Sequence, residues 1–201
     1  MPLIFKRLAL ILSIAGAFAA NNAAADKEPP PFHPPSAAEL PHHETNDKVT
    51  IGADPYISGD KMTAAFGKLI PYQYGIMPVL ISIKNESGQT IRIKDLKAEY
   101  VGPHGDRIEA TPANEVRYAR PVKRPNVPVT PVPIPKRKNP LAAWEIEGRA
   151  LAAEVIPAGN TAFGFLYFQT GLERGAKVYL SGITTVPGGK ELMFFEIPLE
   201  Q

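Results

Sequence analysis

Apolar and polar residues alternate with a strand period in most segments from residue 48 onward. The clearest case is Pro78 to Lys84, where Val79, Ile81 and Ile83 share one face and Leu80 on the other face is also apolar. This pattern is typical of a strand covered on both sides. Shorter alternating segments follow one another between turn residues, at 49–55, 91–93, 96–100, 162–169, 177–182 and 191–198.

The spacing of these segments predicts the fold class. About eight short strands without intervening amphipathic helices indicate an all-β fold, an antiparallel immunoglobulin-like β-sandwich. A closed barrel is the alternative. The aromatic residues of the last strands are expected to pack in the core; they are Phe163, Phe165, Tyr167, Phe168, Phe194 and Phe195.

Two segments have helical signals instead. Ser58 to Gly67 offers a serine cap at its start and a glycine at its end, which predicts a short helix. Asn139 and Pro140 form a second helix start, and strong helix formers continue to Pro157, so a helix is predicted over 140–153. Trp144, the only tryptophan, is expected to anchor that helix to the sandwich or to lie under the preceding loop.

The amino-terminal residues have the composition of an export signal. Lys6 and Arg7 precede an apolar run of 13 residues, Leu8 to Ala20, and small residues follow. Residues 1–25 are therefore interpreted as a signal peptide cleaved after Ala19 or Ala25. No transmembrane segment is expected in the mature chain, because the run is too short to span a bilayer. The protein is expected to be exported, to the periplasm or the cell exterior.

Proline dominates the segment that follows the signal. Residues 26–46 are predicted to be a proline-rich disordered arm, since they lack an apolar period. Residues 47–201 are predicted to form a single β-sandwich domain. The chain has no cysteine, so its stability must come from burial without disulfides.

Three segments resemble secreted bacterial β-sandwich domains of immunoglobulin and fibronectin type. They are KVTIGADPY, GIMPVLISIKNESGQTIRI and VIPAGNTAFGFLYFQTGLERGAKVYLSGI. The resemblance rests on an Asn-x-Ser-Gly turn between two strands and a Pro-x-Gly turn before a late one. It implies a fold, and it carries over no substrate and no functional residue.

The charge distribution singles out one insertion. The whole chain has 22 basic and 20 acidic side chains, and removal of the signal with Lys6 and Arg7 would leave a formally neutral protein. Residues 117–140 combine seven prolines with seven basic residues and no acidic one. This composition predicts an exposed, extended loop that can neither continue a helix nor pair as an inner strand.

The basic loop is the candidate partner-binding site. Its proline-stiffened backbone and positive charges would suit an acidic envelope protein or polymer. A loop that only solvates the domain is the other interpretation. No nucleic acid partner is expected, and the oligomeric state is left open. The candidate residues are Arg117, Arg120, Lys123, Arg124, Lys136, Arg137 and Lys138.

The sequence contains no recognisable catalytic set. The four histidines lie in the arm and in a turn, and the one Ser-x-x-Lys, Ser58 to Lys61, lacks its companion motif. His42, His43 and Glu44 could bind a metal only weakly, so no metal site and no cofactor are expected. The leading hypothesis is a non-enzymatic binding or structural module of the bacterial cell envelope. The alternative is a periplasmic hydrolase or metal-handling protein whose site is unrecognised.

Overall fold

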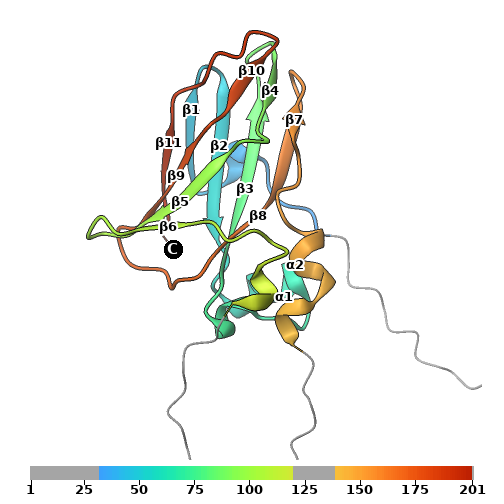
Figure 1. Ribbon diagram of the computed structural model, residues 1–201, viewed down its shortest axis with the longest axis vertical. Helices are drawn as coiled ribbons and strands as arrows, with labels where there is room; N and C mark the ends of the chain where they lie inside the picture. Colours follow the sequence, from blue (N-terminus) through green and yellow to red (C-terminus); the bar gives the residue numbers. More distant parts are fainter. Residues whose placement is uncertain (1–31, 120–138, 201) are drawn as a thin grey trace, which may run out of the picture. The chain divides into compact units, whose positions relative to one another are not determined.

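Strands dominate the part of the chain that the computed structural model describes, residues 32–119 and 139–200. The all-β prediction is confirmed, because eleven strands of these residues form three antiparallel sheets. Figure 1 shows how these strands are arranged. The first sheet has the order β1-β2-β3-β8, formed by His42–Asn46, Val49–Pro55, Met77–Asn85 and Thr161–Phe168. The second has the order β11-β9-β5-β6, formed by Phe195–Pro198, Lys177–Ser181, Lys97–Val101 and Arg107–Glu109.

Three short strands make up the remaining sheet, with the order β10-β4-β7. They are Thr184–Val186, Thr90–Arg92 and Val155–Ile156. The strands predicted around 79–83, 96–100, 162–169 and 177–182 are present close to their expected bounds. The segment predicted over 191–198 becomes a strand only from Phe195, and β1, β7 and β10 were not predicted.

The main core lies between the first two sheets. Alternate residues of β2 and β3 face those of β5, β9 and β11, so that side chains such as Ile51, Ile81, Tyr100 and Val178 are fully buried. This arrangement of two antiparallel sheets around an apolar layer is that of a sandwich. It explains why strands of the second sheet have one buried and one wet face.

A second apolar cluster covers the opposite face of the first sheet. Leu80 of β3 and Phe165 and Tyr167 of β8 pack there against α1 (Gly59–Phe66) and α2 (Trp144–Gly148). Short 3₁₀ turns complete the cover: η1 (Ala37–Glu39), η2 (Pro71–Tyr74), η3 (Val116–Tyr118) and η4 (Pro140–Ala142). Leu80 is thus buried on the face away from the sandwich core, as its apolar surroundings in the sequence predict.

Helix α1 forms as predicted, with Ser58 as its cap. The Ser58 hydroxyl accepts the Lys61 amide at 3.4 Å, and Gly67 ends the helix with a positive φ of 62°. The Lys61 ammonium lies 2.8 Å from both oxygens of the buried Asp54 carboxylate. The Ser-x-x-Lys spacing is therefore explained by a helix cap and an ion pair.

The arm predicted over 26–46 is wrong for its last ten residues. Ala37 and Leu40 are buried against the first sheet, and His42–Asn46 pairs with β2 along its length. Gly52 makes this docking possible, because a Cβ atom there would collide with the Ala37 carbonyl. The composition of this segment did not predict its docking, because a proline-rich segment can pack on an existing surface without a regular alternation of apolar residues. The signal peptide, and the arm up to residue 31, lie outside the described residues.

The helix predicted over 140–153 is shorter than expected. The Asn139 side chain accepts the Leu141 amide at 3.0 Å, but this cap starts the 3₁₀ turn η4, and the α-helical part spans only Trp144–Gly148. Beyond it the backbone bonds to β8: Phe165 donates to the Arg149 carbonyl and accepts the Leu151 amide. Pairing with a strand edge outweighs the helix propensity of the alanines that follow.

The aromatic residues also divide differently from the prediction of one core. Phe165 and Tyr167 are buried in the helix-side cluster, whereas Phe168 and Phe195 are buried between the sheets. Phe163 and Phe194 are exposed. The alternation of a strand sends neighbours to opposite faces, and only the covered part of each face is buried.

Candidate interaction surface

The two ends of the basic insertion meet on the domain. Arg117 is in the turn η3, and Asn139 caps η4. The Asn139 side-chain amide donates to the Arg117 carbonyl at 2.6 Å, while the Arg117 guanidinium pairs with the Glu147 carboxylate. The other predicted binding residues lie outside the described residues: Arg120, Lys123, Arg124, Lys136, Arg137 and Lys138.

Two exposed aromatic side chains lie near the two ends of the insertion in sequence. Tyr118 is 76% exposed and Trp144 is 67% exposed. The prediction that Trp144 anchors its helix to the sandwich is therefore wrong, because Ile146 is the side chain of α2 that is buried. The position of Trp144 on the helix, opposite the buried Ile146, decides its exposure.

The tryptophan ring lies against its own helix, which is attached to the first sheet. A Cβ atom on Gly148 would lie 3.0 Å from the ring carbon Cε3, so the ring lies over this glycine one turn along the helix. The helix itself is tied to the first sheet, since the Tyr167 hydroxyl donates to the Ile146 carbonyl at 2.7 Å. Trp144 is thus an exposed ring on a fixed support.

The histidines do not converge. His42 and His43 alternate along β1, His33 is exposed in the segment before η1, and His104 is exposed in the β5–β6 turn. The His43 Nδ1 atom lies 3.2 Å from the Leu40 carbonyl oxygen. Over residues 32–119 and 139–200, no group of three or more histidine, cysteine or acidic side chains has a geometry suited to a metal ion.

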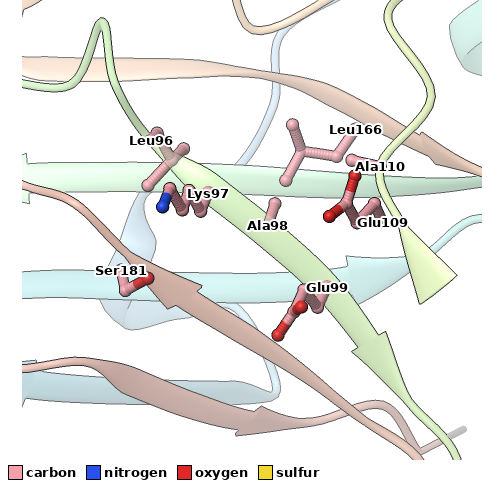
Figure 2. A pocket seen from close by; sticks show the side chains of 8 residues that line it. All are labelled: Leu96, Lys97, Ala98, Glu99, Glu109, Ala110, Leu166 and Ser181. Atoms are coloured by element: carbon pink, nitrogen blue, oxygen red, sulfur yellow. The ribbon is translucent and has the colours of Figure 1, made fainter. Parts of the chain in front are cut away.

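Two neighbouring hollows on the described surface lie beside β5 and β8. The first has a volume of about 470 Å³ and a partly apolar lining, and Figure 2 shows its eight side chains, which come from β5, β6, β8, β9 and adjoining residues. Its apolar members are Leu96, Ala98, Ala110 and Leu166. A second, of about 380 Å³, shares Leu96 and Leu166 with it.

Three of the five charged side chains that line these two hollows form ion pairs. The Glu99 carboxylate is 2.6 Å from Arg107, and the Lys94 ammonium is 3.4 Å from Glu154. In the described residues, no helix is long and apolar enough to cross a membrane.

Comparisons with known proteins do not assign the chain to a family. No family model matches it, and no curated protein matches it in sequence. Among solved structures, it is similar to a "putative lipoprotein (ycdA)" from Bacillus subtilis subsp. subtilis str. 168, with 12% identity and a TM-score of 0.38. The match covers 78% of this chain and 38% of that chain, so this chain spans less than half of that protein's length.

Proposed function

We propose that this protein is an exported, non-enzymatic binding module of the bacterial cell envelope. Its contact surface would be the basic segment 117–140 together with the exposed rings of Tyr118 and Trp144. The acidic partner would be an envelope protein or polymer in the periplasm or outside the cell. The observation that carries the proposal is the exposed ring of Trp144, which follows closely in sequence a segment of concentrated positive charge.

The physical chemistry of the surface supports this role. Exposed tryptophan and tyrosine are enriched where proteins bind other proteins, because a large rigid ring adds contact area at little entropic cost. Positive charge around such a ring would steer an acidic partner toward it. The tie between Asn139 and Arg117 limits the entropy that the ends of the insertion would lose on binding.

The strand order supports the finer proposal of an immunoglobulin- or fibronectin-type sandwich. Strands β2, β3 and β8 are neighbours in one sheet, and β6, β5, β9 and β11 are neighbours in the other. Consecutive strands therefore cross between sheets after β3 and again on either side of β8, as in Greek-key sandwiches. Such folds present loops and insertions on a rigid scaffold, which suits a binding module.

A pull-down from envelope extract tests the contact surface. Glutamine replaces five basic residues in one variant, and binding at low salt should fall by at least about tenfold because their attraction to an acidic partner is lost. The five are Lys123, Arg124, Lys136, Arg137 and Lys138.

A second variant tests the exposed ring. Trp144→Ala should weaken binding in the same pull-down by about tenfold at every salt concentration, because a contact ring contributes to affinity by its burial.

A matched variant controls for net charge. It carries five glutamines on exposed positions of the domain, namely Lys48, Lys68, Arg92, Lys97 and Arg174. This variant should keep wild-type binding. Equal losses in both charge variants, or unchanged binding in the insertion variant, would contradict the proposed surface.

A further inference from the structure

An aromatic pocket on the helix-covered face of the first sheet holds Phe32, the first residue that the structure describes. The Phe32 ring centroid lies 6.1 Å from that of Tyr56, edge to face, and 5.7 Å from that of Phe165. The Arg149 guanidinium carbon lies 5.0 Å from the ring centroid. Phe32 therefore occupies a site with two aromatic walls and one cationic wall.

The pocket walls belong to the core and are fixed without Phe32. Tyr56 is 6% exposed and Phe165 is 1% exposed, and their ring centroids are 4.9 Å apart, edge to face. Phe165 also packs against Phe66 of α1, at 4.8 Å between centroids. Arg149 follows α2, and its carbonyl accepts the Phe165 amide at 2.8 Å.

The chain segment in the pocket has a weaker attachment than the residues after it. Within the described residues, Phe32–Pro35 makes no hydrogen bond, and two of its four residues are prolines without an N–H group. From Ser36 onward the chain is fixed, because Ser36 and Glu39 form a reciprocal cap and Ala37 and Leu40 are buried. Within residues 32–35, the Phe32 ring makes the aromatic and cation–π contacts that hold the segment in the pocket.

The cationic wall has unused binding capacity. Among the described residues, Arg149 forms no ion pair, and its recorded contact is with the ring of Phe32. A guanidinium that stacks on a ring still presents N–H donors at its edge, and a carboxylate is their best acceptor. A ligand with a carboxylate near an aromatic ring would place its ring under the Arg149 guanidinium and its carboxylate at the N–H donors on the guanidinium edge.

We propose that the Phe32 pocket is a peptide-binding site from which the chain's own residue is displaceable. The ligand is an extended segment of a partner protein that carries an aromatic residue beside proline and an acidic residue nearby. Its aromatic ring replaces Phe32 between Tyr56 and Phe165, and its carboxylate pairs with Arg149. Proline keeps such a segment extended, so that little entropy is lost on binding.

Nuclear magnetic resonance titration tests the site with a synthetic nonapeptide, EPPPFHPPS, which has the sequence of residues 28–36. In the Phe32→Ala chain the peptide should shift the signals of the Tyr56 ring and the Arg149 guanidinium. The wild-type chain should bind it about tenfold more weakly, because its own ring competes for the pocket. A peptide with alanine in place of phenylalanine should bind neither chain.

A second variant isolates the cationic wall. Arg149→Gln in the Phe32→Ala chain should weaken peptide binding about threefold to tenfold, since the stacked charge and the carboxylate partner are both lost. Equal binding of the phenylalanine and alanine peptides, or shifts confined to other surfaces, would overturn the proposal.

A label on the intact chain keeps the test independent of variant folding. Fluorine-labelled phenylalanine at position 32 of the otherwise wild-type chain should move toward its solvent-exposed resonance as peptide is added. A fixed resonance at saturating peptide would overturn displacement, and transfer of the ring to a second copy would overturn binding of a foreign segment. These experiments leave the basic segment 117–140 unchanged. The proposed Phe32 pocket can therefore fail its test while the proposed basic contact surface passes its own, and the reverse.

Discussion

Asn85 shows how much one side chain can organise in this fold. It is fully buried at the end of β3, and its amide nitrogen donates to the Gln89 and Ile156 carbonyls at 2.7 and 2.9 Å. Its amide oxygen accepts from the Ser87 hydroxyl at 2.7 Å and from the Ser87 amide at 3.1 Å. One residue therefore satisfies backbone groups in a turn and in β7.

The sequence predicts only part of this role. Asparagine followed by serine and glycine indicates a turn, because its side chain readily bonds to backbone two residues away. The bond to Ile156 joins positions 71 residues apart. No local pattern contains that contact, so the turn was predictable and the burial was not.

Tyr56 makes stability sensitive to high pH. Burial, and secondly the charge of Asp54, raise the pKa of Tyr56 to about 12. An unfolded tyrosine has a pKa of about 10. The folded chain therefore holds the proton more tightly, and this stabilisation is complete below about pH 10 and is lost as the pH rises toward 12.

The Tyr56→Phe variant should lose this part of the alkaline sensitivity. Denaturation at stepped pH should give a fall in unfolding free energy from pH 10 to 12 that is about 1–2 kcal/mol smaller than in wild type. At pH 7 the two proteins should have similar stability, because in the described residues the Tyr56 hydroxyl makes no hydrogen bond. Parallel pH profiles would show that Tyr56 ionises equally in both states.

Helix α2 also combines features that local sequence predicts with features that distant contacts decide. The 3₁₀ turn η4 before it was predictable, because Asn139 and Pro140 form a local cap that needs only neighbouring atoms. The bounds of α2 were not predictable, because Ala143 separates it from η4 and β8 withdraws residues 149–151 from the helix through backbone hydrogen bonds. Gly164 allows this approach, since a Cβ atom there would collide with the Leu151 backbone.

The anchor of α2 can be tested at Tyr167. Tyr167→Phe keeps the packed ring but removes the 2.7 Å bond to the Ile146 carbonyl, so unfolding free energy should fall by about 1–2 kcal/mol in urea denaturation. Trp144 fluorescence should also show greater mobility of the ring, because the helix supports it.

Tyr74→Phe provides the comparison for this change. Tyr74 is half-buried, and no hydrogen bond of its hydroxyl is found in the described structure. Its substitution should leave both stability and tryptophan mobility near wild type. An equal response to the two substitutions would mean that the Tyr167 bond does not position α2.

In the sandwich, side chains connect the two sheets along one side. The Glu44 carboxylate of β1 accepts the Glu196 amide of β11 at 2.7 Å, and Asn46 donates to the Phe194 carbonyl at 3.1 Å. These bonds satisfy part of the free edge of β11 without a further strand. An edge with satisfied backbone groups is a poorer template for pairing with another chain.

Removal of this link should weaken the sandwich. Glu44→Ala leaves the Glu196 amide without its charged acceptor, so unfolding free energy should fall by about 1.5–3 kcal/mol in denaturant titration. Hydrogen exchange at the Glu196 amide should become faster. Glu44→Gln retains an acceptor oxygen and should lose less than half as much, whereas equal losses would point to charge and not to the bond.

Features that depend on neighbouring residues could be predicted without the fold. Period-two alternation predicted the strands, glycine and asparagine predicted turns, and local composition located the basic insertion. Which positions are covered depends on how the strands and helices pack against each other. Trp144 is exposed because α2 turns Ile146 inward, and Phe32 is bound because distant residues form a pocket beside it. Burial depends on what lies across a sheet or helix, and that is set by contacts between segments far apart in the chain.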